Sequence, residues 1–266
     1  MKIFESVPNL SEGIRQDVLD IFAETIRAIP NCRLLDYSGD KDHNRSVFTF
    51  IGTREGIIEG NLALLKCAVQ HIDISKHTGV HPRLGILDVM PIIPVLNTTM
   101  TEAVGLARTL GSYIEKELAI PVYLYEYAAL YPELRNLADV RRLKRYNTYH
   151  PTVGAVCVGA REFLVAYNIN LQTPDVSIAK KIAAQLREAN GGLHGVKAIG
   201  LYLQDKDCAQ VSMNLVDPLV TTPKMVYDSV AALAATYKVN IRNEEYIGLT
   251  PDRVRQAAER FEQELA

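Results

Sequence analysis

The stretch Phe163-Leu164-Val165-Ala166-Tyr167-Asn168-Ile169 predicts a β-strand that leads into a helix expected over 176–189. Asn190-Gly191-Gly192 then follows as a helix stop signal. The later elements complete the order β-α-β-β-α-β: strands over 196–203 and 209–216, a helix over 224–237 and a strand within 239–249. This order is typical of a ferredoxin-like α/β sandwich.

The first half of the chain predicts the same order of elements: a strand over 3–8, a helix over 16–29, strands over 33–36 and 46–51, a helix over 55–72 and a strand over 84–95. Val7-Pro8-Asn9-Leu10-Ser11 is also weakly similar to Tyr167-Asn168-Ile169-Asn170-Leu171. We therefore expect an α/β fold (α+β sandwiches) of two tandem β-α-β-β-α-β ferredoxin-like subdomains. A ligand cleft between them is expected, since domain interfaces favour small-molecule sites.

Extra elements separate the two halves: a helix over 101–118, a strand over 121–125 and a helix over 127–142. A basic linker follows over 140–151 and contains Arg141, Lys144 and Arg145. We place the subdomains at 1–150 and 151–266, the second ending in an amphipathic helix over 251–265.

The composition is that of an ordinary globular protein, with 266 residues of which 48% are hydrophobic and 23% charged. A net charge of −2 argues against nucleic-acid binding, which usually needs a basic surface. We expect no membrane partner, because no apolar run approaches the length of a membrane span. The four cysteines have no C-x-x-C pairing, so we expect reduced thiols and a cytoplasmic protein.

The stretch Ser75-Lys76-His77-Thr78-Gly79-Val80-His81-Pro82-Arg83-Leu84-Gly85 concentrates residues that suit chemistry. His-x3-His is a zinc spacing on a helix, but Gly79 and the proline after His81 disfavour a helix there, which leaves only a non-helical metal site that would borrow His43 or Asp42. A solvated surface loop is the second interpretation. The third is a general acid/base at neutral pH, with Arg83 holding a carboxylate nearby. The stretch alone does not decide between the last two.

A second polar segment, 37–45, lies between two predicted strands and contains Asp40, His43, Asn44 and Arg45. Its composition is equally typical of a solvated turn. As part of a site, it would supply a second histidine and a second arginine.

Several motifs resemble the glutamate formiminotransferase family. The motifs of its N-terminal subdomain appear as Ser6-Val7-Pro8-Asn9-Leu10-Ser11-Glu12-Gly13, Asn44-Arg45-Ser46-Val47-Phe48-Thr49-Phe50, His77-x-Gly79-x-His81-Pro82-Arg83-x-Gly85 and Pro121-Val122-Tyr123-Leu124-Tyr125. Those of its C-terminal subdomain appear from Val153 through Leu171, at Gly200-Leu201-Tyr202-Leu203 and from Ala209 to Leu215.

The resemblance implies a transferase of one-carbon metabolism that moves a formimino group from N-formiminoglutamate to tetrahydrofolate during histidine degradation. It implies His81 as the catalytic acid/base, tetrahydrofolate as co-substrate, no metal and a homodimer. The substrate- and folate-binding candidates are Asn9, Asp40, His43, Asn44, Arg45, His77, Gly79, Arg83, Asn168 and Asn170.

The segment between the two halves is shorter than in catalytic members of the family. This leaves an alternative function: a folate- or glutamate-binding homologue with lost or altered activity, for example formyl transfer between 5-formyltetrahydrofolate and glutamate.

Overall fold

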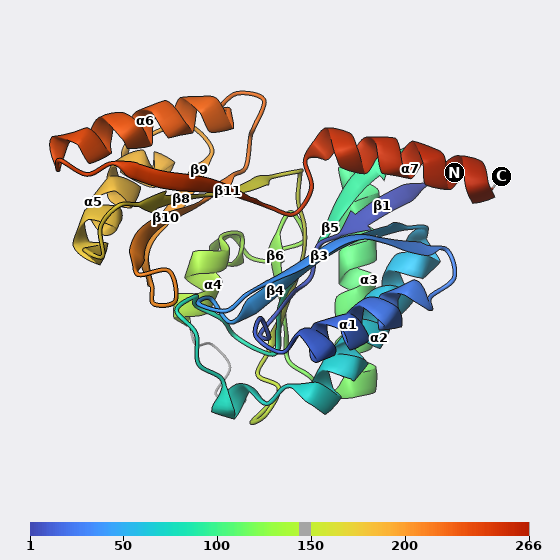
Figure 1. The fold of residues 1–266 in the computed structure, drawn as a ribbon. Helices are drawn as coiled ribbons and strands as arrows, with labels where there is room; N and C mark the ends of the chain where they lie inside the picture. The colour runs from blue at the N-terminus through green and yellow to red at the C-terminus, as the bar shows by residue number, and fades with distance from the viewer. Residues whose placement is uncertain (144–149, 266) are drawn as a thin grey trace. The chain divides into compact units, whose positions relative to one another are not determined.

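The computed structural model describes residues 1–143 and 150–265 (Figure 1). The chain forms two compact units. Unit 1 comprises Met1–Glu162 together with Asp252–Ala266, and unit 2 comprises Phe163–Pro251.

Unit 1 contains a seven-stranded sheet. Its strands are β1 (Ile3–Ser6), β2 (Asn9–Leu10), β3 (Cys32–Asp40), β4 (Arg45–Gly52), β5 (Leu87–Leu96), β6 (Val122–Glu126) and β7 (Val156–Ala160). β1 and β2 both pair with β4 on one side and β5 on the other, and β3 pairs with β4. The order β3-β4-β1/β2-β5 is therefore antiparallel and ferredoxin-like. β7 and β6 extend it beyond β5 as parallel strands.

Three long helices cover one face of this sheet: α1 (Gln16–Arg27), α2 (Arg54–His71) and α3 (Met100–Leu118) (Figure 1). Val156 and Val158 of β7 contribute to the core beneath these helices, whereas Cys157 belongs to a separate core cluster. Because successive strand residues point to opposite faces, that second cluster lies on the other face of the sheet. It includes Leu134 and Val140 from the short α4 (Leu137–Leu143) and the turn before it.

Unit 2 is a four-stranded sheet in the order β11-β8-β10-β9. The strands are β8 (Val165–Leu171), β9 (Val196–Leu203), β10 (Cys208–Leu215) and β11 (Ile241–Ile247). The helices α5 (Val176–Leu186) and α6 (Pro223–Thr236) pack on the face that presents Tyr167, Ile169 and Leu171. The predicted fold class, an α/β protein built from two ferredoxin-like subdomains, is thus confirmed.

The helix predicted over 127–142 is wrong. The structure has only a 3-10 turn, η2 (Pro132–Leu134), and α4. Tyr131 is extended, as the residue before a proline tends to be, and Pro132 has no N–H to continue a helix. The apolar periodicity of this segment comes from two short elements that both cover the β6–β7 end of the sheet.

The contact boundary between the units falls after Glu162, whereas the sequence predicts it after 150. The difference arises from β7, which the sequence analysis does not anticipate and which pairs with β5 and β6 of unit 1. The final helix, α7 (Pro251–Leu265), also belongs with unit 1.

All four cysteines are free thiols, and Cys157 and Cys208 are buried. Within 1–143 and 150–265, none of the helices is long and apolar enough to cross a membrane. Of the basic residues predicted in the linker, Arg141 lies on α4, while Lys144 and Arg145 lie outside the described residues.

Candidate functional site

Two loops of unit 1 meet at the ends of its strands. One loop joins α2 to β5 and contains His77, Gly79 and His81; we call it the histidine loop, residues 73–86. The other is the β3–β4 turn, residues 40–45. A Cβ on Gly79 would lie 2.5 Å from the carbonyl oxygen of His43, so only glycine permits this approach. The two polar segments singled out in the sequence are therefore neighbours.

Arg83 holds the two loops together. Its guanidinium donates to the carbonyl oxygens of His43 at 2.7 Å, Asn44 at 2.9 Å and His81 at 2.9 Å. Burial and then the charge of Arg45 lower the pKa of Arg83 to about 10. The sequence also predicted that Arg83 binds an anion. Its guanidinium group donates to backbone carbonyl oxygens in this structure, so anion binding by Arg83 stays a prediction.

Asn44 and Asp40 shape the β3–β4 turn. Asn44 has a φ of 43°, a left-handed conformation that asparagine tolerates better than most residues. Its side chain donates to the carbonyl oxygen of Thr78 at 2.7 Å and accepts from the N–H of Gly13 at 3.0 Å. The Oδ1 atom of Asp40 accepts from the N–H of His43 at 2.8 Å. Both side chains thus fix the conformation of the backbone at His43 and Arg45.

His81 has the geometry of a proton acceptor. Its Nδ1 lies 2.7 Å from the carbonyl oxygen of Pro82, which can only accept, so Nδ1 carries the ring hydrogen. Burial, followed by the charges of Arg45 and Arg141, lowers the pKa of His81 well below its usual range. The ring is therefore neutral near pH 7, with a lone pair at Nε2. Among the residues that the structure describes, no hydrogen-bond partner to Nε2 is found.

The other two histidines lie around this ring. The His43 ring is buried and its centroid lies 5.9 Å from that of His81, with the planes tilted by 30°. The Nε2 atom of His77 lies 3.0 Å from the carbonyl oxygen of Asn44 and 2.6 Å from Nη1 of Arg83. Burial and Arg83 lower the pKa of His77. His77 thus contacts the arginine that joins the two loops.

A buried ionic triad is formed by Arg45 of β4, Asp88 of β5 and Arg141 of α4. Asp88 Oδ2 accepts from Arg45 Nη1 at 2.8 Å and from Arg141 Nη2 at 2.5 Å, and its Oδ1 accepts from the N–H of Leu84 at 2.7 Å. Burial alone would raise the pKa of Asp88, but the two arginines hold it far below its usual value. Asn9 joins the triad by accepting from Arg45 Nε at 3.1 Å.

A β-bulge positions Asp88. Between β2 and β5, Asn9 pairs with Val89 and Leu10 pairs with Leu87, so Asp88 is the extra residue on β5. Bulges commonly redirect a side chain next to a functional site. Asp88 is not among the site residues predicted from the sequence. The signal was present, because Asp88 is the single charged residue in the apolar run expected over 84–95.

Asn168 and Asn170 lie in unit 2, whereas the other candidates lie in unit 1. Both alternate with Tyr167 and Ile169 on β8 and therefore point to the face of that sheet opposite α5 and α6. Asn170 donates to Glu245 at 2.8 Å and accepts from Gln210 at 2.9 Å, and Glu245 pairs with Lys206. These contacts form a buried amide network within unit 2.

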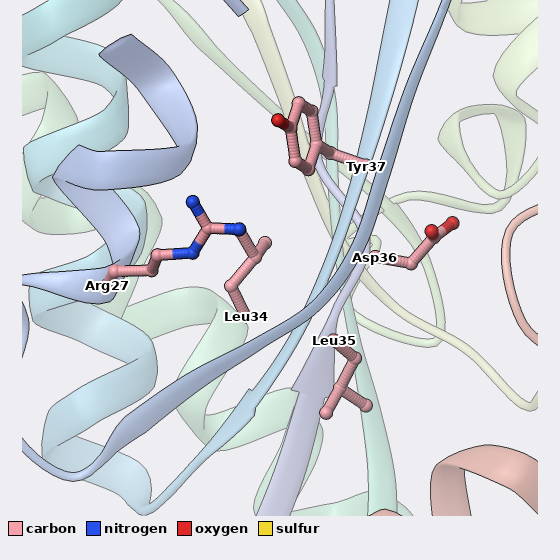
Figure 2. A pocket seen from close by; sticks show the side chains of 5 residues that line it. All are labelled: Arg27, Leu34, Leu35, Asp36 and Tyr37. Carbon is pink, nitrogen blue, oxygen red and sulfur yellow. The ribbon is translucent and has the colours of Figure 1, made fainter. Parts of the chain in front are cut away.

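A surface pocket of unit 1 lies elsewhere, between the end of α1 and β3. Figure 2 shows Arg27, Leu34 and Tyr37 on one side of the strand and Asp36 on the other. The Tyr37 hydroxyl donates to Asp20 at 2.9 Å, and Arg27 lies 5.8 Å from the centre of the Tyr37 ring. This pocket contains none of the predicted site residues. In the described part of the chain, no group of three or more His, Cys, Asp or Glu side chains forms a metal-binding arrangement.

Comparisons with known proteins identify the family of this chain. A family model described as the N-terminal subdomain of the formiminotransferase domain matches residues 3–163, and one described as the formiminotransferase domain matches residues 166–264. The chain is 42% identical to a glutamate formimidoyltransferase of Streptococcus pyogenes, over 94% of this chain and 89% of that protein. It is 38% identical to a glutamate formimidoyltransferase of Thermoplasma acidophilum, over 95% of this chain and 89% of that protein.

A longer relative, a formimidoyltransferase-cyclodeaminase of Gallus gallus, is 37% identical over 98% of this chain, which corresponds to 52% of that protein. The two family models leave little of the described chain unmatched, and the break between them lies close to Glu162, although the second model also includes α7, which the contacts group with unit 1. The resemblance inferred from the motifs is confirmed: this chain belongs to the formiminotransferase family.

Proposed function

We propose that this protein is a glutamate formimidoyltransferase, which transfers the formimino group of N-formiminoglutamate to tetrahydrofolate, with His81 as general acid and base. Family membership supports the transfer reaction. One structural observation carries the assignment of His81: its Nδ1 faces the carbonyl oxygen of Pro82 at 2.7 Å, which directs the basic lone pair to Nε2.

The residues present suit substrates of this chemistry. Tetrahydrofolate supplies a nucleophilic amine, N5, and the donor is a dicarboxylate with an amidine carbon. An open imidazole nitrogen can take a proton from an amine, and a neighbouring cluster of arginines suits carboxylates. The orphaned Nε of Arg141, buried without a partner in the described part of the chain, shows that the cluster has an unused donor.

His81 would move one proton during the reaction. In the net transfer, a bond from N5 to the formimino carbon forms and the bond from that carbon to the glutamate nitrogen breaks. Nε2 of His81 accepts the proton that N5 loses and then donates it to the departing glutamate nitrogen. The ring begins and ends neutral, so no further acid or base is required.

The remaining candidates act around His81 in this proposal. Asp40, Asn44, Gly79 and Arg83 fix the two loops, while His43 packs beside the catalytic ring. Asn9 orients Arg45 for a substrate carboxylate. Asn168 and Asn170 of unit 2 stay predicted substrate-binding residues, and His77 helps to place Arg83.

Four further expectations stay predictions: a cytoplasmic location, a homodimer, a cleft between the subdomains and a reaction without metal. Light scattering after size-exclusion chromatography tests the dimer. Activity measured with and without a chelator tests the need for metal.

The first test is a product assay. Purified protein is incubated with tetrahydrofolate and N-formiminoglutamate, and formation of the 5-formimino product is followed. Wild-type protein is expected to form product, and His81→Ala is expected to lose about 10²- to 10⁴-fold in kcat, the usual contribution of a general acid/base. His194→Ala is the matched control, since His194 is an exposed histidine of unit 2 with 58% of its side chain accessible. It is expected to stay within about twofold of wild type.

Circular dichroism of each variant checks that the fold is retained. Folate binding by both proteins without product from either would overturn the proposal and leave a folate-binding homologue. Product formed only from 5-formyltetrahydrofolate and glutamate would instead assign formyl transfer.

A further inference from the structure

The triad contains more positive than negative charge. Two guanidinium groups, those of Arg45 and Arg141, share the carboxylate of Asp88. Asp88 has no exposed surface and the Arg45 side chain is 8% exposed, so water compensates this charge only weakly. Burial lowers the pKa of Arg45; the charge of Asp88 acts in the opposite direction, and the charge of Arg141 lowers the pKa further. The two cations therefore repel each other across a single anion.

Nearby acidic side chains are engaged elsewhere. Glu12 pairs with Arg15 at 2.6 Å and also accepts from the N–H groups of Ile14 and Arg15. Asp40 accepts from the backbone of the β3–β4 turn. The histidines cannot compensate, because an imidazole is either neutral or positive. Within the described residues, the triad itself thus carries one unit of net positive charge.

Arg141 also has an unused hydrogen-bond donor. Its Nε is buried and has no hydrogen-bond partner among residues 1–143 and 150–265. Leaving a buried donor unpaired costs about 1–3 kcal/mol, and more for a charged group, so such a group calls for an explanation. A carboxylate is the anion that best fits a guanidinium, because it can accept two parallel N–H bonds.

We propose that Arg141, held on Asp88 beside Arg45, binds a carboxylate of the one-carbon donor. The inference rests on the proposed transferase function, because it identifies the donor as the ligand. It makes Arg141 a substrate-binding residue and Asp88 a positioning residue that orients both guanidinium groups.

The bound carboxylate would also assist His81. In the free protein, the charges of Arg45 and Arg141 disfavour the imidazolium form of His81. A substrate carboxylate on Arg141 brings a negative charge next to the same cations and so raises the proton affinity of the ring. His81 would then become a stronger base once the donor is bound.

Steady-state kinetics separate this role from a structural one. Arg141→Gln is expected to raise the KM for N-formiminoglutamate by about 10- to 100-fold, the loss of one charge-assisted hydrogen-bond pair. The KM for tetrahydrofolate is expected to stay within twofold. Arg141→Lys keeps the charge without the planar fork and should recover only part of the affinity.

Arg142→Gln is the matched control. Arg142 is the next residue of α4, its side chain is 77% exposed, and it pairs with Asp139 on the same helix. Its KM for the donor should stay within twofold of wild type. Equal rises of both KM values in Arg141→Gln, a rise confined to tetrahydrofolate, or no rise at all would each overturn the inference.

A direct binding measurement tests the role of Arg141 without relying on catalytic turnover. Calorimetry with glutamate should show binding to wild-type protein and to Arg142→Gln, and a 10- to 100-fold weaker affinity for Arg141→Gln. If the wild-type protein formed no product but bound glutamate through Arg141, the proposed function would fail while the anion subsite stood. Equal glutamate affinity in wild type and Arg141→Gln would show that Arg141 does not bind the carboxylate, even if the enzyme were active.

Discussion

At the scale of the residue, Glu5 is an unusual carboxyl group. It lies on the central strand β1, paired with Ile51 and Ile93, and is 4% exposed. Burial raises the pKa of Glu5 to about 7, while the charge of Arg161 acts in the opposite direction. The neighbouring Phe4 packs beneath the helices, so Glu5 points to the other face of the sheet, as do Asn9 and Arg45.

Glu5 should make the stability of the protein depend on pH. Because its pKa is raised in the folded state, the folded protein binds the proton more tightly, and the free energy of unfolding falls as pH rises from about 4.5 through 7. The loss is about 3 kcal/mol above that window. Glu5→Gln cannot ionise and should remove this loss, as measured by urea denaturation between pH 5 and 8.

Glu59→Gln controls for the change of a carboxyl to an amide, since Glu59 is exposed on α2. Its stability curve against pH should run parallel to that of the wild type. A Glu5→Gln curve that is also parallel would show that Glu5 is not the group that titrates.

Sequence reasoning found the residues of the site that belong to recognisable motifs. His81, His43 and Arg45 lie together as expected, because their loops connect helices and strands that the sequence predicts. Asp88 and Arg141 were not assigned to the site, because the bulge and the distant α4 bring them together only in three dimensions. Arg83 differs from these two residues. Its motif was recognised in the sequence, but its hydrogen bonds to backbone carbonyl oxygens could not be predicted from that motif.

At the scale of the element, Gly79 controls the path of the histidine loop. A Cβ there would lie 2.5 Å from the His43 carbonyl oxygen and 2.7 Å from Nη2 of Arg83. The backbone oxygen cannot move cheaply, so Gly79→Ala should separate the two loops and displace His81. We expect at least about a tenfold loss of kcat/KM, equivalent to a barrier increase of about 1.4 kcal/mol. The product assay measures it.

Gly105→Ala is the contrasting substitution. Gly105 lies within α3, and a Cβ there would meet nothing within 4 Å. The substitution should stabilise the helix by about 0.5–1 kcal/mol and leave kcat/KM unchanged. Equal activity in the two glycine variants would contradict the steric role of Gly79.

The elements that the sequence predicted well have a regular spacing of apolar residues and recognisable capping residues. α3 begins at a capping box formed by Thr99 and Glu102, and α2 begins after Thr53, so both were expected close to their observed ends. β7 was not expected, because its five buried residues show no alternation. A strand buried on both faces cannot be distinguished by periodicity from other short apolar runs.

At the scale of the whole molecule, α7 returns the chain to unit 1 after unit 2 is complete. Val254, Ala258 and Phe261 are its buried residues. Glu262 pairs with the amino group of Met1, Glu264 pairs with Arg33, and the Arg33 guanidinium lies 5.0 Å from the centre of the Phe261 ring. The sequence predicted the helix and assigned it to the second subdomain, whereas its contacts, with partners more than two hundred residues away in the chain, group it with unit 1.

Phe261→Ala should therefore destabilise unit 1 rather than unit 2. Truncating a buried phenylalanine costs about 3–5 kcal/mol. Hydrogen exchange measured by mass spectrometry should become faster in β1 and β3, while β8 and β10 keep their protection. Glu259→Ala, at an exposed position of the same helix, should change neither. Faster exchange confined to β8 and β10 would place α7 with the other unit.

The return of α7 also bears on how the protein is made. A ribosome emits the chain from the N-terminus, so every strand and helix of unit 2 emerges before the last helix of unit 1. Unit 2 can thus close its own core during translation. Unit 1, although begun first, must keep the apolar surface under Val254, Ala258 and Phe261 open until synthesis passes α7. That interval is when the nascent chain is most exposed to aggregation and most in need of a chaperone.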